Sequence, residues 1–573
     1  MSIGGIALRK LFTYLQPHFL RMVLGLLVKV LGTFMDLGLP YVLAYILDDV
    51  IKMEDIRVLL IWGGVMVLLS IGARTFNIIA NRMASKVARD TVEVLRNDLF
   101  AKIQSLSGAQ VDEFTIPSLE TRLTSDTYNI HHMVGMMQRL GVRAPILLIG
   151  GIVLTISLEP VLAMVLLGTI PFLATVVYSV SKKGIPLYTK LQLSIDRLVR
   201  VVRENISGVR VIKALSKTQY EKQRFHQVNM EVSEEERVAG MTMAITNPSM
   251  NLLLNVGLTA VIIVGAYRVN AGASEPGKIV AFLSYFAIIL QAVMSISRIF
   301  VVYSKAAASA NRIQEVLDAP EDLQQVDIPV EDSENHIEFR NVSFSYTEEP
   351  CIENISFNLK QGESLGIIGS TGAGKTTLIN LLMRFYDVNE GSILINGKDV
   401  RSFNKQELRK KFGVVFQNDV LFMDKVGENI SLGRDISIEQ MAAAAKHAQA
   451  AEFIDKLDGK FDFPLAIKGS NLSGGQKQRL LITRALAGKP EILILDDSSS
   501  ALDYKTDSQL RKAIRENYTG ITSIIIAQRI SSVMKLDHIM VIEDGKMVGY
   551  GNHEDLLSNC GVYQEIYQSQ LMA

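Results

Sequence analysis

Six apolar stretches in residues 1–310 constrain this chain more than any other feature. A helix that crosses a lipid bilayer needs about 20 mostly apolar residues. Three stretches contain no Asp, Glu, Lys or Arg: Pro160–Ser181, Gly240–Tyr267 and Ile279–Ser297. Three weaker stretches lie near Leu20–Leu47, Val58–Ala73 and Val134–Leu158. Buried helices or strands of a soluble domain would rarely give so many stretches in so short a sequence. We therefore predict six membrane-spanning helices.

Positive charge is concentrated in two long connections, one after the second stretch and one after the fourth. The opposite connections are short and carry few cations. Loops on the cytoplasmic side of a membrane carry an excess of Lys and Arg. We therefore expect the N-terminus, both basic connections and everything after Lys305 to lie in the cytoplasm of a cell-membrane protein. The cations are Arg82, Lys86, Arg89, Arg96 and Lys102 in the first connection and Lys182, Lys183, Lys190, Arg197, Arg200, Arg203, Arg210 and Lys213 in the second.

The two basic connections are also helix-prone, which predicts spans that continue far into water as helical stalks. The stalks are expected over Asn81–Ser107 and Lys182–Glu204. Each is followed by a Ser-Gly pair, after which we expect a short transverse helix, near Val111–Leu119 and Gly208–Ser216. A charged amphipathic stalk can also be a plain solvated surface.

An acidic, polar segment separates the apolar part of the chain from a part with different patterning. We place a transmembrane domain at 1–319, a linker at 320–335 and an α/β domain at 336–573. The turn pairs Asn396-Gly397 and Asp544-Gly545 indicate some antiparallel strands in the last domain. Lys plus Arg and Asp plus Glu both total 59, so charge gives no reason to expect a nucleic-acid partner. Two cysteines, Cys351 and Cys560, make a disulfide framework improbable.

A phosphate-binding loop of the pattern G-x-x-x-x-G-K-[ST] follows an apolar strand and opens a helix, as the motif requires. Its glycines let backbone N–H groups converge on phosphate oxygens, and the helix N-terminus adds positive potential. The lysine would meet the β- and γ-phosphates of ATP, and the next hydroxyl would bind Mg²⁺. The residues are Gly369, Ser370, Thr371, Gly372, Ala373, Gly374, Lys375 and Thr376, followed by Thr377.

A second apolar strand, Ile492–Leu495, ends in two aspartates. Asp496 suits the Mg²⁺ shell of a nucleotide site. An isolated Asp-Asp pair is usually a turn, but a buried strand that delivers it beside a phosphate loop favours the metal role.

Between these two strands lies Leu472-Ser473-Gly474-Gly475-Gln476, and with it the chain resembles an ATP-binding cassette (ABC) transporter. The pentapeptide resembles the signature of that family. Physically, a serine hydroxyl and glycine N–H groups at a helix N-terminus can donate to a γ-phosphate. The resemblance implies a RecA-like nucleotide-binding domain, ATP and Mg²⁺ as ligands, and two cassettes that sandwich two ATP molecules. In that arrangement each ATP lies between the phosphate loop of one chain and the signature of the other.

The resemblance assigns three further positions. Tyr346 falls where the family stacks an aromatic ring on adenine, and Gln417 matches the glutamine that senses Mg²⁺ and links to the membrane domain. Asp503 closes Ser500-Ala-Leu-Asp503, which matches the loop that crosses between cassettes. One cassette fused behind six spans resembles an exporter half-transporter, because importers of the family usually keep these parts on separate chains.

Two positions depart from the family pattern. The residue after the metal-binding aspartate is normally Glu, which polarises the attacking water, and here it is Asp497. The loss of one methylene withdraws the carboxylate by roughly 1.5 Å, and a misplacement of ~1 Å can cost on the order of 10²-fold in rate. The switch histidine is replaced by Gln528, whose amide can donate a hydrogen bond but cannot carry a proton. Before the signature, Ile467-Lys468-Gly469 replaces the usual Glu-Arg-Gly.

These departures predict an impaired ATP site in this chain, although neutral drift with adequate activity is the alternative. The signature itself is intact, so the resemblance is to the weak-site subunit of bacterial heterodimeric multidrug exporters, and we expect a different half-transporter as partner. The predicted function is ATP-driven export of hydrophobic or amphipathic compounds by alternating access. The alternatives are an ATP-gated channel or weakly hydrolysing regulatory subunit, a lipid or peptide exporter, and a soluble cassette ATPase, which the six spans disfavour.

The membrane half gives only hints about what is carried. An aromatic and aliphatic stripe at helical spacing could touch a drug, but helix packing is the preferred interpretation. Several methionines could form an adaptable pocket, with core packing again preferred. Asp36 and Lys29 are expensive inside a membrane and so are candidates for lining a cavity, although they could simply face a partner helix. The stripe is Phe282, Tyr285, Phe286 and Ile289, and the methionines are Met133, Met136, Met137, Met241, Met243 and Met250.

Overall fold

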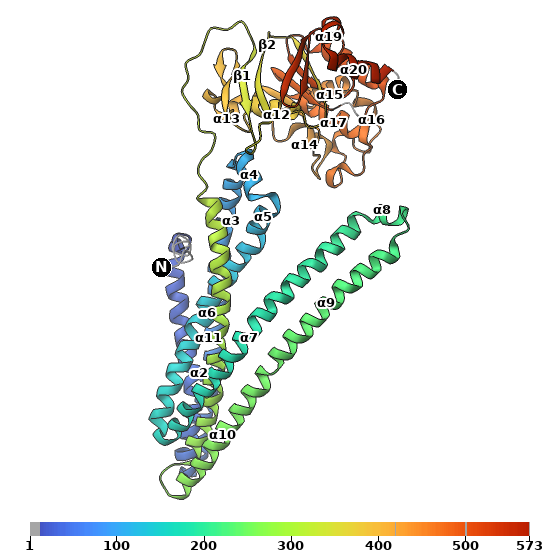
Figure 1. Ribbon diagram of the computed structural model, residues 1–573. Coiled ribbons are helices and arrows are strands. Elements are labelled where there is room, and N and C mark those ends of the chain that lie inside the picture. The colour runs from blue at the N-terminus through green and yellow to red at the C-terminus, as the bar shows by residue number, and fades with distance from the viewer. Residues whose placement is uncertain (1–11, 419, 499–500, 572–573) are drawn as a thin grey trace. The chain divides into compact units, whose positions relative to one another are not determined.

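The chain divides into two compact units, each of which is described by itself (Figure 1). Unit 1 comprises Met1–Gln104 and Pro117–Ala319, and unit 2 comprises Ser105–Ile116 and Pro320–Ala573. The computed structural model describes residues 12–571 apart from 419, 499 and 500, without the side chains of 170, 173, 174, 177, 181, 185, 246, 247 and 297.

Unit 1 is built from helices, several of which are far longer than the helices of a globular domain. They are α2 (Phe19–Tyr45), α3 (Ile56–Ser105), α5 (Ile116–Thr121), α6 (Thr127–Leu158), α7 (Pro160–Ser207), α8 (Val209–Ala214), α9 (Thr218–Ala244), α10 (Thr246–Asn270) and α11 (Pro276–Leu317), with short helical turns at Gln16–His18, Ile46–Val50, Ile51–Met53 and Arg122–Asp126. At 1.5 Å per residue, the 50 residues of α3 extend about 75 Å, against a hydrocarbon core of about 30 Å. The predicted stalks are thus continuations of α3 and α7.

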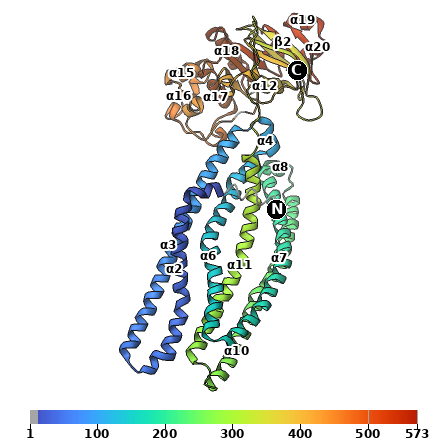
Figure 2. The same ribbon diagram turned by 90° about the vertical axis from the view of Figure 1, so that its left-hand side faces the viewer.

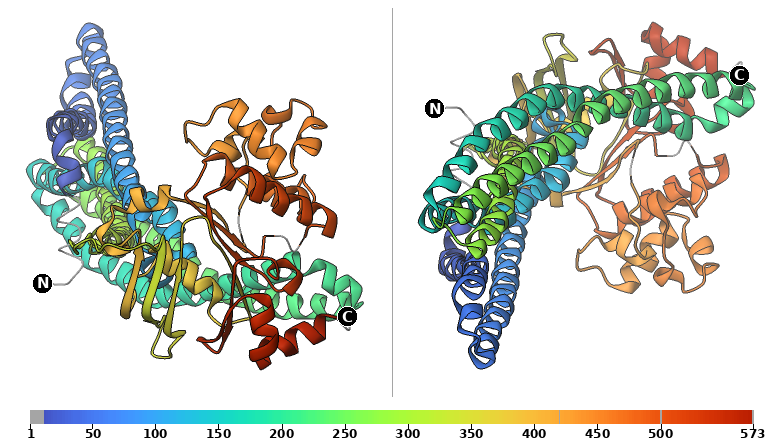
Figure 3. Two further views of the ribbon diagram at one scale, coloured as in Figure 1. Left: turned by 90° about the horizontal axis from the view of Figure 1, so that it is seen from above. Right: turned by 90° about the horizontal axis from the view of Figure 1, so that it is seen from below.

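The helices of unit 1 pack in sets that differ from their order in the chain. α6 packs along α11, and α2 contacts both of them. α7 lies beside α9 and α10, and Figures 2 and 3 show these helices side by side along their length. The short helix α8 joins α7 to α9, at the place predicted for the second transverse helix.

Five stretches of the described residues are long and apolar enough to cross a membrane. They are Phe12–Met53, Ile56–Ser105, Ile116–Leu158, Thr218–Asn270 and Pro276–Leu317. The sixth predicted span lies at the start of α7. There the structure gives a shorter apolar stretch, Pro160–Thr169, which ends where the side chain of residue 170 is not described. The chain therefore has several candidate spans, and the count of six stays a prediction.

The predicted span Gly240–Tyr267 is not one uninterrupted helix. α9 ends at Ala244 and α10 begins at Thr246. Pro248 explains the break, because proline lacks the N–H that would donate to the carbonyl of Ala244. Ile245 keeps helical dihedral angles, so the chain runs on in nearly the same direction.

Unit 2 is an α/β domain with two sheets. One sheet has the order β2-β1-β4-β5 and is antiparallel, and the other has the order β10-β9-β3-β8-β7-β6 and is parallel except for β10. The strands are β1 (Ile337–Phe344), β2 (Ile352–Leu359), β3 (Ser364–Gly369), β4 (Glu390–Ile395), β5 (Lys398–Asp399), β6 (Phe412–Val415), β7 (Ile492–Asp496), β8 (Thr522–Ile526), β9 (His538–Glu543) and β10 (Lys546–Gly551). Both predicted turn pairs join antiparallel strands, β4 to β5 and β9 to β10.

The helices of unit 2 cover the parallel sheet and form its core together with buried strands. β7 is buried at every position, as expected of a central parallel strand. The helices are α4 (Gly108–Phe114), α12 (Lys375–Leu382), α13 (Lys405–Lys410), α14 (Val426–Ser431), α15 (Ile438–His447), α16 (Ala451–Asp455), α17 (Gly474–Ala487), α18 (Tyr504–Asn517), α19 (His553–Asn559) and α20 (Gly561–Leu571), with single turns at Val400–Ser402, Lys460–Asp462, Ile467–Gly469 and Ile530–Ser532.

Candidate nucleotide site

The four neighbouring parallel strands β3, β8, β7 and β6 bring the predicted site residues to one edge of the sheet. The phosphate loop follows β3, Gln528 follows β8, Asp496 and Asp497 end β7, and Gln417 follows β6. The carboxyl ends of neighbouring parallel strands form a common edge, which is where α/β domains bind ligands. Residues separated by more than 150 positions in the sequence therefore meet in unit 2.

The phosphate loop has a backbone that only glycine adopts easily. Gly372 and Gly374 have φ angles of +88° and +96°. A Cβ at Gly374 would lie 2.5 Å from Ile352 Cδ1 and 3.0 Å from the Cys351 carbonyl oxygen. The loop therefore presents its N–H groups without side chains in the way, and the helix α12 begins directly after it. This cradle fits a polyphosphate.

Lys375 lies folded back onto the same loop. Its Nζ donates to the carbonyl oxygens of Gly369 and Ser370 at 2.9 and 2.7 Å. Burial lowers the pKa of Lys375, and the carboxylates of Asp496 and Asp497 oppose that change. The ammonium thus sits at the mouth of the loop, where a phosphate oxygen could replace the two carbonyls as its acceptor.

Thr376 and Asp496 are in direct contact. The Thr376 hydroxyl donates to Asp496 Oδ2 at 2.9 Å, and Asp496 is only 2% exposed. Burial raises the pKa of Asp496, while this hydrogen bond and Lys375 oppose the rise. A buried carboxylate beside a hydroxyl at the start of α12 fits the oxygen donor set that Mg²⁺ prefers.

Asp497 and Gln528, the two departures from the family pattern, contact each other. Gln528 Nε2 donates to Asp497 Oδ2 at 3.0 Å. Asp497 has a φ angle of +48°, and its N–H donates to the Ile526 carbonyl at the end of β8. Burial raises the pKa of Asp497, and Lys375, Arg529 and the Gln528 hydrogen bond oppose the rise. The shortened carboxylate therefore accepts a hydrogen bond from a neutral amide, which, unlike an imidazole, cannot exchange a proton.

Tyr346 lies beside the helix that follows the phosphate loop. Its hydroxyl is 3.4 Å from Thr377 Oγ1 and 3.5 Å from Asn380 Nδ2, both on α12. Its ring meets those of Phe344 and Tyr386 edge-on at 4.8 and 5.1 Å between centroids. Because the ring is 47% exposed, one part of it remains open for stacking with a flat base.

The signature residues begin helix α17. Ser473 is its N-cap, and its side chain accepts from the Gln476 N–H while the Gln476 side chain accepts from the Ser473 N–H. This reciprocal pair is a capping box. Gly474 and Gly475 follow at the open N-terminus of the helix, where a Cβ on Gly475 would lie 3.1 Å from the Ala501 carbonyl oxygen. No hydrogen bond in the described part of unit 2 joins these four residues to the phosphate loop.

Two other predicted positions have structural partners of their own. Asp503 is the N-cap of α18 and accepts from the N–H and hydroxyl of Thr506 at 2.9 and 2.7 Å, which lowers its pKa. Ser500, in the same predicted crossing loop, lies outside the described residues. Lys468, in the Ile-Lys-Gly variant before the signature, has a φ angle of +55°.

One contact of unit 2 was not predicted from the sequence. Tyr386, just after α12, donates its hydroxyl to Asp112 on α4 at 2.7 Å. Ser107, which caps α4, donates to Asp322 at 2.5 Å, and a Cβ on Gly108 would lie 2.9 Å from Tyr386 Cζ. The transverse helix between α3 and α5 is therefore held against the helix of the phosphate loop. The Ser-Gly pair indicated the helix, but no local pattern indicated its partner.

A second unpredicted residue, Arg384, fixes the linker. Arg384 is 1% exposed and donates to Asp387 and to the carbonyl oxygens of Arg401 and Gln324. Residues 320–335 form no helix or strand, and they lie bound along unit 2. A fully buried arginine with carbonyl acceptors cannot be told from an exposed one by sequence pattern alone.

The residues singled out in the membrane half lie mostly in the interior of unit 1. All four residues of the stripe on α11 are at most 2% exposed, as the packing interpretation predicted, and the Tyr285 hydroxyl donates to the Leu37 carbonyl at 2.6 Å. Lys29 donates to Asn81 on α3, and Asp36 pairs with Arg143 on α6. The methionines differ in exposure: Met133 and Met250 are buried, whereas Met137 and Met241 are exposed.

Comparison with known proteins agrees with this geometry. Residues 22–293 match the ABC transporter transmembrane region, and residues 352–500 match the ABC transporter family's ATP-binding region. An uncharacterised ABC transporter ATP-binding protein of Bacillus subtilis (strain 168), YfiB, is 35% identical over 98% of both chains. A fatty acid ABC transporter ATP-binding/permease protein of Mycobacterium bovis is 32% identical over 85% of this chain and 77% of its own length.

Among solved structures, a bacterial Atm1-family ABC exporter with ATP bound superposes with a TM-score of 0.79 at 24% identity, covering 96% of this chain and 98% of that one. The chain belongs to the ABC transporter family and combines its transmembrane and ATP-binding regions in one polypeptide. Membership implies binding of ATP, typically with Mg²⁺, and ATP hydrolysis coupled to transport.

Proposed function

We propose that this chain is one subunit of an ATP-driven exporter in the cytoplasmic membrane, with six spans and its ATP-binding domain in the cytoplasm. The transmembrane domain is 1–319, the linker 320–335 and the nucleotide-binding domain 336–573. Export of hydrophobic or amphipathic compounds by alternating access is supported by the long apolar helices of unit 1 and by the fold shared with an Atm1-family exporter. Lipid transport is the favoured subclass, because a relative is described as a fatty acid transporter.

In this proposal the residues of the sheet edge hold Mg²⁺ and ATP. Lys375 would bind phosphate oxygens, Thr376 and Asp496 would hold Mg²⁺, and Gln417 would complete the metal shell. Tyr346 would stack on adenine. The glycine cradle, the contact of Thr376 with Asp496 and the open face of Tyr346 support these assignments.

We further propose that the ATP site of this chain is catalytically weak. The observation that carries this proposal is the pair of Asp497 and Gln528, joined at 3.0 Å. A general base must reach the proton that it removes. Asp497 has lost the reach of a glutamate, and Gln528 can orient a phosphate but cannot exchange a proton. Together they suit a site that binds ATP and turns it over slowly.

An intact signature beside a weak site favours pairing with a different chain. Ser473, Gly474 and Gly475 lie at an open helix N-terminus and make no hydrogen bond to the phosphate loop within the described residues of this chain. In a two-chain assembly they would complete the site of the partner, and that site would carry most of the hydrolysis. A second copy of this chain would instead place two weak sites in one dimer.

Measurement of the chain alone tests the proposal. Purified without a partner, it should bind ATP but hydrolyse it far more slowly than the ~10 s⁻¹ typical of enzymes. Nucleotide binding is the control, because it shows that the phosphate loop is folded. Steady, cooperative hydrolysis at that typical rate by a verified homodimer would refute the weak-site proposal. Uptake of a lipophilic compound into inverted vesicles against its gradient separates an exporter from a channel.

A further inference from the structure

Three helix faces in unit 1 bring charged and amide side chains together at the cytoplasmic end of the predicted membrane spans. Lys29 and Asp36 lie seven residues apart on α2, and Arg139 and Arg143 lie four apart on α6, so each pair shares one helix face. Between them, α3 presents Asn77 and Asn81, also four residues apart. These six residues are called the polar cluster below.

The hydrogen bonds of the polar cluster run between the three helices. Lys29 Nζ donates to Asn81 Oδ1 at 3.0 Å. Asp36 Oδ2 accepts from Arg143 at 2.9 Å and from Asn77 at 3.2 Å. Gly32, between Lys29 and Asp36, permits this approach, since a Cβ there would lie 3.1 Å from both Asn77 Nδ2 and Phe76 Cβ.

The charges of the polar cluster do not balance. It holds three cations, Lys29, Arg139 and Arg143, and one carboxylate, Asp36. That carboxylate is taken by Arg143. Over residues 12–571, with the gaps given above, neither Lys29 nor Arg139 has a carboxylate partner: Lys29 is 3% exposed and bonded to an amide, and Arg139 donates to the Gly135 carbonyl. Buried unpaired charge in a membrane segment is costly and marks functional sites.

Unsatisfied polar atoms accompany this excess charge. Arg143 Nε and Asn77 Oδ1 are buried and have no hydrogen-bond partner among the residues that the structure describes. Buried polar groups are rarely left in this state. The polar cluster therefore has both the charge and a free N–H donor to accept an anion.

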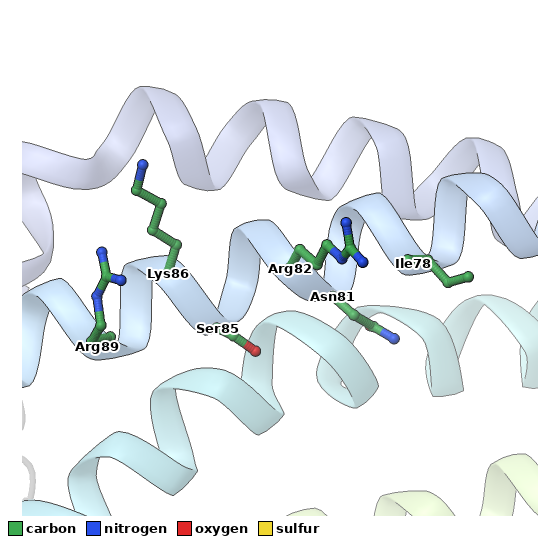
Figure 4. Close-up of a pocket in the computed structure, with 6 residues that line it drawn as sticks. All are labelled: Ile78, Asn81, Arg82, Ser85, Lys86 and Arg89. Carbon is green, nitrogen blue, oxygen red and sulfur yellow. The ribbon is translucent and has the colours of Figure 1, made fainter.

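A pocket opens next to the polar cluster and is basic as well. It has a volume of about 530 Å³ and is lined by Ile78, Asn81, Arg82, Ser85, Lys86 and Arg89. Figure 4 shows Arg82, Lys86 and Arg89 extending from one side of α3, and Asn81 and Ser85 from the other. Asn81 belongs to both the pocket lining and the polar cluster. Arg89 pairs with Asp90, whereas Arg82 and Lys86 have no carboxylate partner among the described residues.

Exposed apolar side chains lie on the same two helices, α2 and α3, as Lys29 and Asn81. Leu24 and Leu27 on α2 and Ile71 and Ile78 on α3 are each about half exposed or more. A ligand with an anionic head and an acyl tail would match this arrangement, because the tail would lie along apolar helix surface while the head reaches the cations. Clusters of Lys and Arg just cytoplasmic of a membrane-spanning helix suit such head groups.

We propose that the polar cluster and the adjoining basic pocket form a binding site for the anionic head group, carboxylate or phosphate, of a single-chain or membrane-lipid amphiphile. Lys29 supplies a buried positive charge and Arg139 a half-buried one, and Arg82 and Lys86 attract the head group at the entrance. Asp36 keeps Arg143 in place and is not itself a site for cationic compounds. The claim that the amphiphile is transported rests on the proposed export function. The claim that it binds at this site does not.

Binding to the assembled, full-length transporter in nanodiscs of zwitterionic phosphatidylcholine, without ATP, tests the site. The probes are palmitate, palmityl alcohol and palmitylamine, which share a tail and differ in head charge. Palmitate should bind at least ~10-fold more tightly than the other two, as expected for hydrogen bonds to charged groups. Lys29→Gln, and separately the exposed double variant Arg82→Gln/Lys86→Gln, should each weaken palmitate binding several-fold to ~10-fold. Lys52→Gln, which alters an exposed cation paired with Glu275, is the matched control and should bind like the wild type.

A second arm identifies the source of the head group. If added phosphatidylglycerol displaces palmitate from the wild type, the natural occupant is an anionic membrane lipid, and if it does not, the site selects single-chain amphiphiles. Equal binding of palmitate and its alcohol, or unchanged palmitate binding in both variants, would overturn the proposal. Because no ATP is present, a failure of palmitate to bind would not affect the weak-site proposal. Likewise, fast ATP hydrolysis by the isolated chain would not affect the proposed head-group site.

Discussion

At the scale of single residues, the proposed weakness of the nucleotide site depends on two differences from the family pattern. Asp497 is one methylene group shorter than the usual glutamate, and Gln528 has an amide in place of an imidazole. Asp497 sits in the left-handed backbone region, at a φ angle of +48°, which Asp and Asn tolerate better than Glu. The backbone and the shortened side chain are thus mutually consistent, and Gln528 supplies the donor that holds the carboxylate. In our proposal this arrangement favours the binding of ATP over its hydrolysis.

Restoring the two family residues should restore chemistry. We expect Asp497→Glu/Gln528→His to raise the ATPase rate of the isolated chain by about 10-fold or more, because the longer carboxylate regains roughly 1.5 Å of reach. Backbone strain from a glutamate at the left-handed position of Asp497 would reduce this gain by on the order of 1 kcal/mol. Steady-state phosphate release measures the effect, and Asp462→Glu, at an exposed aspartate that pairs with Lys425, is the control. A double variant no faster than the wild type would show that the weakness lies elsewhere.

Much of this residue-scale picture could be predicted from the sequence, because each motif carries its chemistry within a few positions. The phosphate loop, the aspartate pair and the signature are local patterns attached to a strand or a helix start. What could not be predicted was which residues meet across the chain, such as Asp497 with Gln528 or Lys29 with Asn81. Such pairs depend on strand order and helix packing.

At the scale of elements, helix α4 is tied to the end of the phosphate-loop helix by a single tyrosine. Tyr386→Phe removes the hydroxyl that donates to Asp112. We expect basal ATP hydrolysis to stay near normal while stimulation by transported compound falls several-fold, because a hydrogen bond to a charged group is worth about 1.5–3 kcal/mol. The ratio of stimulated to basal ATPase is the measurement. Tyr550→Phe, whose hydroxyl donates to the Asn358 carbonyl within the domain, should leave that ratio unchanged.

His336 links the two sheets of unit 2 and makes their stability depend on pH. It is 3% exposed, and its Nδ1 lies 2.6 Å from Thr522 Oγ1, at the start of β8. Burial lowers the pKa of His336 below its usual value. The unfolded chain therefore binds a proton at higher pH than the folded one does. It follows that the contribution of His336 to stability is complete above the unfolded pKa of about 6.5 and is lost as pH falls below it.

His336→Gln should remove this component of the pH dependence. Between about pH 7.5 and 5.5, on either side of the usual histidine pKa, the melting temperature of the wild-type nucleotide-binding domain should fall by more than that of the variant. Differential scanning fluorimetry of the full chain with ATP analogue present gives both curves. Parallel curves would mean that another group causes the loss. The pairing of His336 with Thr522, 186 residues away, could not be read from either segment alone.

At the scale of the whole molecule, apolar stretches predicted the class of protein, and the helix-prone basic connections predicted the stalks, which belong to the 50-residue α3 and the 48-residue α7. The break before Pro248 and the binding of the linker by Arg384 were not predicted. Both depend on a single residue whose effect is set by its surroundings. The proposed partner chain also belongs to this scale, because an intact signature would complete an ATP site on another chain.

Two substitutions in the transporter assembled with its partner test that central claim most directly. In the proposed assembly, Ser473 would reach the phosphate loop of the partner, whereas Asp497 would serve the phosphate loop of its own chain. Ser473→Arg places a bulky cation at the open end of α17 and should abolish most hydrolysis. Asp497→Asn should change it only modestly, because little chemistry depends on that carboxylate. ATPase activity of both reconstituted variants at saturating ATP is the measurement. If Asp497→Asn proved crippling and Ser473→Arg mild, the asymmetric account would be contradicted.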